Sequence, residues 1–315
     1  MKRNALGKTG LNVTELCTGL LPMGPAHLDL PGEKCVSIIQ TARKLGVNFF
    51  DTAKGYRTQP FLKEALGKES ESVIIATKSP AVDSDTMARD VEESLEQTGR
   101  NYLDIYHLHA AVEPEPFTNR VGALKRLLEF KDQGMIRAVG VATHHVRVVR
   151  DAAGRDDIDV IFPLINLTGM GISDGTREDM EEAIRRASNA GKGIYAMKPF
   201  AGGNLLDRFR EAVEYMRGIE GVSSVAMGVV SEEELAFDVR VFNDEQISDS
   251  EYAAQTRRPK KMIVIGRCKA CGACVKVCSA GAIAVKDNNA VISAEKCILC
   301  GYCALECPEF CIRSV

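Results

Sequence analysis

The 315-residue sequence contains no tryptophan, and only 6% of its residues are aromatic. It has no apolar run near the roughly 20 residues that a membrane-spanning helix needs. The first ten residues, MKRNALGKTG, lack the apolar stretch of a secretory signal peptide. We therefore expect no membrane association and a reducing cytoplasm, where structural disulfides are rare.

The composition is that of a globular protein, with 45% hydrophobic and 26% charged residues. The formal net charge is −3, so neither sign dominates. The chain is long enough for a barrel-sized domain and a second, small one.

Cysteine is concentrated in the tail. Four cysteines are spaced C-x-x-C-x-x-C-x-x-x-C, and the same spacing recurs 29 residues later, followed by Pro308 (Cys268, Cys271, Cys274, Cys278; Cys297, Cys300, Cys303, Cys307). The repeat extends beyond the cysteines, because Gly272 pairs with Gly301 and Ile283 pairs with Ile312 at the same separation. The tail therefore contains two copies of one unit. This run is typical of bacterial ferredoxins, in which three thiolates of each run bind one [4Fe–4S] cluster and the fourth binds the other.

Zinc and disulfides are the competing explanations for these cysteines. A tetrahedral zinc needs only four thiolates, and disulfides need an oxidising compartment. We therefore predict two [4Fe–4S] clusters, one held by Cys268, Cys271, Cys274 and Cys307, the other by Cys297, Cys300, Cys303 and Cys278. Cys311 aligns with Ala282 in the repeat, which predicts packing rather than ligation. Ser279 stands where the first run would usually carry proline.

The tail has eight basic and four acidic residues from Lys260 onward. Each oxidised cluster with its four thiolates adds about −2, so the loaded tail is nearly neutral. We therefore expect neither a nucleic-acid nor a membrane partner.

The first 240 residues alternate between strand and helix patterns. After an N-terminal hairpin, strands are expected near 15–19, 47–51, 72–78, 103–109, 136–142, 159–165, 193–198 and 222–228. Helices are expected near 33–45, 60–66, 84–97, 118–133, 145–153, 177–190 and 232–241, and none is placed between the last two strands. No G-x-G-x-x-G follows the first strand, which weakens a Rossmann interpretation. Eight buried apolar strands that alternate with helices favour an α/β fold, a (β/α)8 TIM barrel.

The expected domains are a barrel over 1–242, a polar linker over 243–260 with a short helix near 249–257, and a small α+β ferredoxin-like domain over 261–315.

Polar side chains close three successive strands of the predicted barrel: Asp51, Lys78 and His109, with Tyr56 in the loop after the first of them. The carboxyl ends of barrel strands carry the chemistry, so these four residues should face one mouth. A lysine ammonium lowers the pKa of a nearby tyrosine, an aspartate keeps that lysine charged, and a histidine can hydrogen-bond a substrate oxygen. Singly, each could be a cap, a solvated side chain or core packing; together they suit proton delivery to a carbonyl. His107, two residues before His109, is interpreted as packing beneath it.

These residues carry a resemblance to a family. LGKTGLNVTEL, FFDTAKGY, the lysine of ATKS and LDIYHLH are similar to the aldo-keto reductases over roughly residues 1–240. The resemblance implies Tyr56 as general acid/base, Asp51 and Lys78 as residues that tune it, and His109 as the residue that orients the carbonyl. With its tail, the whole chain resembles the iron–sulfur aldo-keto reductases.

The nucleotide pocket departs from the family. Asn166 and Gly228 match its cofactor-binding positions, and Lys198 is an addition at the end of the seventh strand, where barrels often bind phosphate. The usual Ser-Asn is Ala142-Thr143, the amide four residues before Asn166 is Phe162, and the nicotinamide-stacking aromatic is Met197. No basic residue follows Gly228 for a 2′-phosphate. NAD(P)H is therefore expected with a weakened site, and a flavin is the alternative.

We expect an oxidoreductase that interconverts a small carbonyl and an alcohol, with electrons relayed through the clusters and a redox partner such as a ferredoxin. Two alternatives are a redox-sensing or docking module whose barrel no longer turns over, and an electron-transfer subunit whose partner does the chemistry. The first gives no reason to keep Asp51, Tyr56, Lys78 and His109 together.

Overall fold

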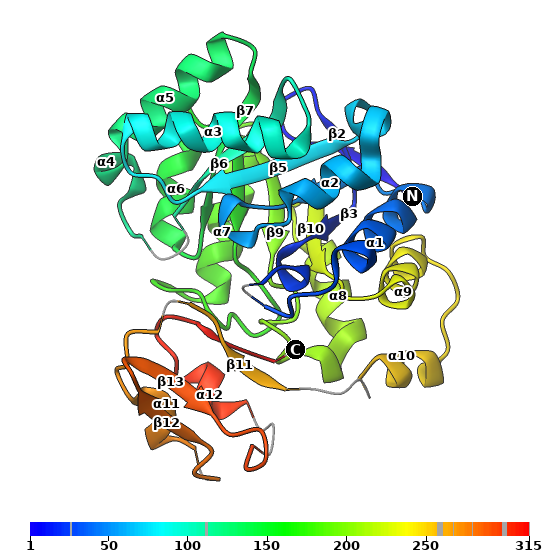
Figure 1. Ribbon diagram of the computed structural model, residues 1–315, viewed down its shortest axis with the longest axis vertical. Coiled ribbons are helices and arrows are strands. Elements are labelled where there is room, and N and C mark those ends of the chain that lie inside the picture. Colours follow the sequence, from blue (N-terminus) through cyan, green and yellow to red (C-terminus); the bar gives the residue numbers. More distant parts are fainter. Residues whose placement is uncertain are drawn as a thin grey trace.

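The computed structural model describes residues 1–25, 27–110, 113–256, 261–266, 268–278, 280–297 and 301–314, the side chains of 68–70 and 256 excepted. Its main body is a closed barrel of parallel strands in the order β10-β3-β4-β5-β6-β7-β8-β9 (Figure 1). The strands are β3 (Leu16–Gly19), β4 (Phe49–Asp51), β5 (Ile74–Ser79), β6 (Leu103–His109), β7 (Ile136–Thr143), β8 (Val160–Pro163), β9 (Gly193–Met197) and β10 (Ser224–Gly228). The antiparallel hairpin of β1 (Arg3–Ala5) and β2 (Asn12–Thr14) precedes them. The predicted (β/α)8 barrel is confirmed.

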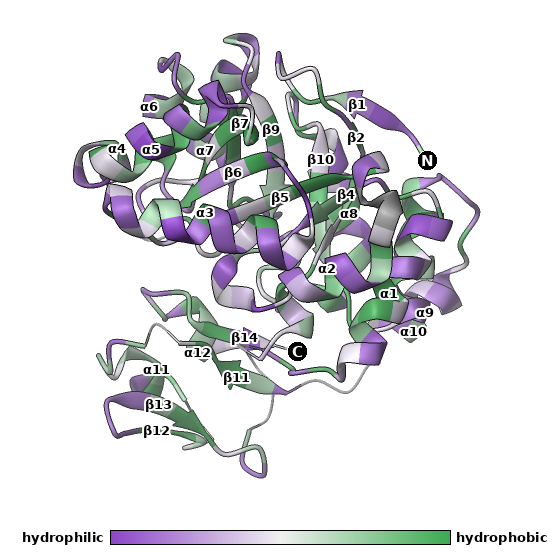
Figure 2. Cartoon of the chain, turned by 45° about the horizontal axis from the view of Figure 1, so that its top comes forward, coloured by the Kyte–Doolittle hydropathy of each residue, from purple (hydrophilic) through white to green (hydrophobic). Residues whose placement is uncertain are grey.

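Helices surround the barrel. They are α1 (Gly32–Lys44), α2 (Gln59–Leu66), α3 (Ser84–Thr98), α4 (Pro116–Asn119), α5 (Val121–Asp132), α6 (Val146–Ala153), α7 (Arg177–Asn189), α8 (Phe209–Gly218) and α9 (Glu232–Phe242), followed by α10 (Asp249–Thr256). In Figure 2 the helices around the barrel alternate between hydrophilic and hydrophobic bands, as amphipathic helices do. Their apolar faces cover the outside of the strands.

The sequence analysis placed no helix between the last two strands, and this was wrong: helix α8 lies there. Its buried residues Phe209, Ala212, Val213 and Met216 follow the i, i+3, i+4, i+7 spacing of a helix face. The region expected as one helix over 118–133 is also divided, between α4 and α5. Both differences lie outside the barrel strands and leave the mouth of the barrel unchanged.

Strand alternation divides the core into two layers. Successive side chains of a strand point to opposite faces, so Phe49 packs inside the barrel and Phe50 packs against the surrounding helices. The same alternation turns Ile105, on β6, to the interior and Tyr106 to the helices. The interior side chains therefore come from alternate positions of each strand.

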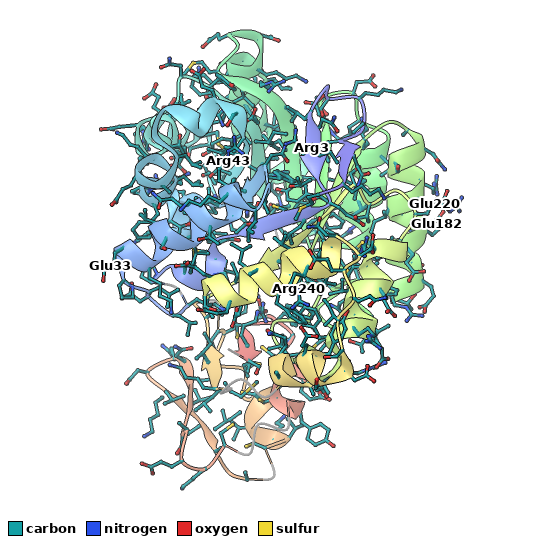
Figure 3. All side chains as sticks on the ribbon, turned by 90° about the vertical axis from the view of Figure 1, so that its right-hand side faces the viewer. Arg3, Glu33, Arg43, Glu182, Glu220 and Arg240 are labelled. Carbon is teal, nitrogen blue, oxygen red and sulfur yellow. The ribbon has the colours of Figure 1, made fainter. Side chains whose placement is uncertain are left out.

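The C-terminal segment, from Lys261 to Ser314, lies against one end of the barrel in both Figure 1 and Figure 3. It has two antiparallel strand pairs, β11 (Met262–Val264) with β14 (Ile312–Ser314) and β12 (Ile283–Lys286) with β13 (Asn289–Ile292). Its short helices α11 (Ala273–Lys276) and α12 (Tyr302–Leu305) each follow a glycine with positive φ, Gly272 (75°) and Gly301 (79°). The paired glycines of the sequence repeat thus occupy equivalent turns.

Phe310 fixes where this segment lies. Its ring joins the apolar cluster that continues into the barrel interior, and it lies beside His144, whose ring centroid is 6.0 Å away. His144 follows β7, so the segment lies at the carboxyl ends of the strands. Among the described residues, no helix has the length and apolar character needed to cross a membrane.

Candidate active site

The four residues predicted at the mouth lie together. Asp51 ends β4, Lys78 is near the end of β5, and His109 ends β6. Tyr56 lies in a short 3-10 helix, Lys54–Tyr56, directly after β4. The Tyr56 ring lies 4.8 Å from the Lys78 ammonium nitrogen and edge-on to the His109 ring, with centroids 6.0 Å apart. The barrel thus gathers side chains that span 58 residues of sequence.

Lys78 and Asp51 form a buried ion pair, each less than 5% exposed. Lys78 Nζ donates to Asp51 Oδ1 and Oδ2 at 2.7 and 2.8 Å, and to the Thr52 carbonyl oxygen at 2.7 Å. Burial raises the pKa of Asp51, although the charge of Lys78 acts to lower it. Burial acts to lower the pKa of Lys78, but the charges of Asp51 and Tyr56 outweigh burial and raise it. Three acceptors around Nζ require three N–H donors, so Lys78 is an ammonium and Asp51 a carboxylate.

Tyr195, on β9, is a further member of the site that the sequence analysis missed. Its hydroxyl lies 3.0 Å from Asp51 Oδ2 and 2.7 Å from His107 Nε2. The Asp51 carboxylate can only accept, so Tyr195 donates to Asp51 and accepts from His107. Burial, then Asp51, raises the pKa of Tyr195, while burial and Lys78 lower that of His107, so both are neutral.

His107 therefore does more than pack beneath His109. It carries its proton on Nε2, and Nδ1 faces β7 at Gly140, where a Cβ would lie only 2.2 Å away. A glycine is needed there for this imidazole to fit. His107, Tyr195, Asp51 and Lys78 form one hydrogen-bonded chain, which runs from the barrel interior to the ring of Tyr56.

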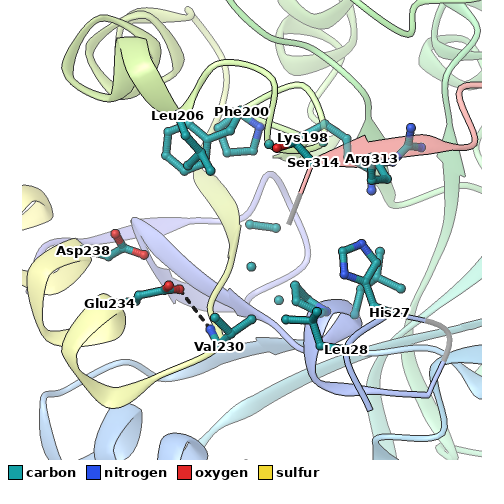
Figure 4. Close-up of a pocket in the computed structure, with 18 of the residues that line it drawn as sticks. His27, Leu28, Lys198, Phe200, Leu206, Val230, Glu234, Asp238, Arg313 and Ser314 are labelled. Atoms are coloured by element: carbon teal, nitrogen blue, oxygen red, sulfur yellow. Dashed lines mark hydrogen bonds between the residues drawn. The ribbon is translucent and has the colours of Figure 1, made fainter. Parts of the chain in front are cut away.

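A cavity of about 700 Å³ opens above these residues (Figure 4). Asp51 and Tyr56 line it from the barrel, and Arg313 and Ser314 line it from the C-terminal segment. Its size falls within the range of about 300–1,000 Å³ that is usual for small-molecule sites. The cavity is therefore built by both parts of the chain.

The predicted nucleotide residues are divided between the cavity and the core. Lys198 and Gly228 line the cavity, together with Phe162 and Met197. Asn166 is fully buried, and its amide serves its own loop: Nδ2 donates to the Met170 carbonyl at 2.9 Å, while Oδ1 accepts from Met170 N at 3.1 Å. The structure thus does not bring the Asn166 amide to the cavity. The Phe162 ring stacks on Tyr195, with centroids 3.9 Å apart.

The cysteines predicted for the first cluster converge. Cys268, Cys271, Cys274 and Cys307 line one small cavity inside the C-terminal segment. The first three cysteines follow one another at every third position, and Cys307 comes back to them from the second run. The four thiols therefore surround one space, as the ligands of a [4Fe–4S] cluster do. Cys311 also lines this cavity, with its sulfur 3.3 Å from that of Cys307.

For the second cluster, Cys278, Cys297 and Cys303 pack in the apolar cluster of the same segment. Cys300 and Ser279 lie outside the described residues. Within the described part of the chain, no group of three or more His, Cys, Asp or Glu side chains is arranged to hold a single metal ion.

Comparisons with known proteins agree with this geometry. The model of the Aldo/keto reductase family matches residues 15–220, and that of the 4Fe-4S dicluster domain matches residues 250–312. The NADH-specific methylglyoxal reductase of Escherichia coli (strain K12) is 28% identical over 188 residues, which cover 51% of this chain and 58% of that protein. The L-galactose dehydrogenase of Arabidopsis thaliana is 26% identical over 221 residues, 65% of this chain and 67% of that protein.

Solved structures show the same fold. An aldo-keto reductase from Bacillus halodurans in its holo form superposes with a TM-score of 0.65 at 21% identity, over 82% of this chain and 96% of that one. The two curated relatives named above are matched over only 58% and 67% of their own lengths.

Proposed function

This chain belongs to the aldo/keto reductase family, and we propose that its barrel interconverts a carbonyl and an alcohol with electrons relayed through two [4Fe–4S] clusters. The family makes it an oxidoreductase, and the C-terminal match supports iron–sulfur clusters. The relay and the identity of the substrate are our proposal, as is the assignment of individual residues to roles. NAD(P)H, a flavin and a ferredoxin are the candidate electron donors.

One observation carries the proposal: the stretch that contains Cys307 also forms the wall of the active-site cavity. Phe310, three residues after this cysteine, packs at the mouth of the barrel beside His144, and Arg313 and Ser314 line the cavity that holds Asp51 and Tyr56. When bound, the clusters would supply or take up electrons one at a time. A docking module has no need for a cysteine segment joined to a cavity with paired acid–base residues.

In the direction of reduction, the carbonyl carbon gains a hydride, which a bound NAD(P)H or flavin would supply, and the carbonyl oxygen gains a proton. We assign delivery of the proton at oxygen to the Tyr56 hydroxyl, because Tyr56 lines the cavity and its ring lies 4.8 Å from the buried Lys78 ammonium. The Lys78 charge stabilises the phenolate that this transfer leaves, and Asp51 keeps Lys78 charged. Tyr195 keeps Asp51 ionised by donating to it. We assign the hydrogen bond to the substrate oxygen to His109, whose ring centroid lies 6.0 Å from that of Tyr56.

Iron content gives a first prediction. Anaerobic protein should contain about eight iron and eight acid-labile sulfide per chain, as two clusters require. Cys274→Ala should lose a cluster, since Cys274 shares a cavity with three other predicted ligands. Cys311→Ala is the matched control, because Cys311 lines the same cavity but has no ligand position in the repeat. Stoichiometric zinc without labile sulfide in the wild type would refute the clusters.

Nucleotide binding gives a second prediction, which also tests the proposed function. NADPH should bind weakly, because the Asn166 amide is engaged in its own loop and Glu233, Glu234 and Asp238 line the cavity beyond Gly228. NADH should bind no better than comparably. Chemically reduced clusters should instead be reoxidised by a carbonyl substrate through a flavin bound in the barrel, which would gather two electrons and a proton into the hydride that the carbonyl carbon takes up. Anaerobic titration calorimetry with both nucleotides, and cluster absorption followed after substrate addition, measure these two expectations.

The opposite outcome is equally well defined. Submicromolar binding of NADPH, together with full NADPH-driven carbonyl reduction by Cys274→Ala, would overturn the relay. The clusters would then be structural or regulatory, and the barrel would work as an ordinary nicotinamide enzyme.

A further inference from the structure

The C-terminal strand is built into the wall of the cavity. Ser314 N donates to the Gly202 carbonyl oxygen at 2.8 Å, which joins β14 to the loop after β9. A Cβ on Gly203 would lie 1.9 Å from Ser314 O, and one on Gly202 would lie 2.3 Å from Arg313 Cδ. Both glycines also have positive φ, 67° for Gly202 and 89° for Gly203. Only residues without a Cβ allow the C-terminal strand to approach this closely, so the two glycines are required for the contact.

Arg313 is held in place at the cavity. It is 4% exposed, and the carbon of its guanidinium lies 3.7 Å from the centroid of the Phe310 ring. Its Nη1 donates to the Ile312 carbonyl oxygen at 3.0 Å. A guanidinium that is stacked and hydrogen-bonded in this way is already oriented, so binding an anion costs little further side-chain entropy.

Two further basic groups share this part of the cavity. Lys198 and His27 line it beside Arg313. Burial lowers the pKa of His27 to about 4, and the charges of Lys198 and Arg313 both add to that effect. His27 is therefore neutral, and two cations act on the same imidazole.

The acidic lining lies elsewhere. Figure 4 shows Glu234 and Asp238 on the opposite side of the cavity from His27 and Arg313. Glu234 already accepts a hydrogen bond from Val230 N at 3.1 Å. Asp51, at the floor, is paired with Lys78. The cavity therefore has a basic end, formed partly by the C-terminal segment, and an acidic end.

We propose that Lys198, Arg313 and His27 form an anion subsite, so that the substrates of this barrel are carbonyl compounds or alcohols that also bear a carboxylate or phosphate group. The inference rests on the proposed function, in which this cavity holds the substrate. The anionic group would bind at the basic end while the carbonyl lies beside Tyr56. Charge-assisted hydrogen bonds from a guanidinium and an ammonium are the strong ones for such a group.

A pair of isosteric probes tests this subsite by binding alone. Anaerobic titration calorimetry with the full-length, iron-loaded protein would compare 4-(hydroxymethyl)benzoate with its uncharged amide, 4-(hydroxymethyl)benzamide. We expect the acid to bind about tenfold more tightly or better, and Arg313→Gln to remove most of that preference. Arg313→Lys should keep part of it. Lys198→Gln should weaken it from the barrel side, which covers the case that Arg313→Gln does not fold.

Arg208→Gln is the matched control, because Arg208 is a surface residue paired with Glu211 at 2.6 Å and does not line the cavity. Equal binding of acid and amide to the wild type would overturn the proposal. So would an equal loss for both probes in Arg313→Gln, which would indicate packing, or a loss of NADH binding without loss of the acid preference, which would assign the cations to a dinucleotide.

A functional arm separates this inference from the proposed function. The corresponding aldehydes, 4-formylbenzoate and 4-formylbenzamide, would be offered to protein with chemically reduced clusters. Reoxidation by the acid in preference to the amide supports both proposals. No reoxidation by either aldehyde, with the binding preference intact, would contradict the electron relay while still supporting the anion subsite.

Discussion

Tyr56→Phe is expected to lower the rate of carbonyl reduction by about 10²–10⁴-fold, the usual worth of a positioned general acid. The change removes only the hydroxyl, so the ring still packs against Lys78 and His109. Iron content and the absorption of the clusters should not change, because Tyr56 does not line the cavity of the cysteines predicted for the first cluster. The measurement is kcat/KM for one carbonyl substrate that the wild type reduces well.

Tyr215→Phe is the matched control for this experiment. Tyr215, on α8, donates to Glu181 Oε1 at 2.6 Å, outside the cavity that holds Tyr56. Its loss should cost about 1.5–3 kcal/mol of stability, the usual contribution of a hydrogen bond to a charged group, and leave turnover unchanged. Activity of Tyr56→Phe within a factor of about two of the wild type would show that the proton comes from another donor.

The sequence was sufficient for the barrel and for the mouth, because both follow from local rules. Strand alternation and the positions of Asp51, Lys78 and His109 at strand ends placed these side chains at one end before any contact was known. The same alternation would have turned Tyr195 inward, two residues before Met197. Its role stayed hidden because its partner Asp51 lies 144 residues away, and no spacing rule connects them.

The position of the C-terminal segment on the barrel could not be predicted from the sequence for a related reason. The cysteine spacing determines the turns within the segment, and Cys307 returns to the first three thiols as the repeat implies. Whether Phe310 would pack inside the barrel depends on the shapes of two surfaces that are far apart in sequence. The paired glycines Gly202 and Gly203 were the available signal, since adjacent glycines in a loop indicate a close backbone approach.

Lys78→Met should be the most destabilising single change considered for the barrel. Lys78 and Asp51 are both buried, and within the described part of the chain the substitution leaves the Asp51 carboxylate with the Tyr195 hydroxyl as its side-chain hydrogen-bond donor. Removing one partner of a buried ion pair costs about 3–5 kcal/mol, because the other charge is left uncompensated. Lys131→Met is a matched control: Lys131 also binds both oxygens of one carboxylate, that of Asp159, at 2.8 and 2.6 Å, but both side chains are partly exposed. It should cost about 1 kcal/mol or less.

The pH dependence distinguishes a lost charge partner from lost packing. Burial already raises the pKa of Asp51, and without Lys78 only the hydrogen bond from Tyr195 and the charge of Lys198 oppose that rise. An acid whose pKa is higher in the folded state binds more protons there, so its contribution to stability is present in acid and is lost as the pH rises through the folded-state pKa. The gap between Lys78→Met and wild type should therefore be small in acid and widen towards neutral pH. Denaturation followed by far-UV circular dichroism, at matched iron content and several pH values, measures it.

A double variant, Asp51→Asn with Lys78→Met, completes the test of the ion pair. It should recover part of the loss, because the introduced amide is neutral and its carbonyl oxygen can still accept from the Tyr195 hydroxyl. If the double variant were no more stable than Lys78→Met, and the gap did not change with pH, the loss would be assigned to packing. The argument that Asp51 is held as a carboxylate would then fall.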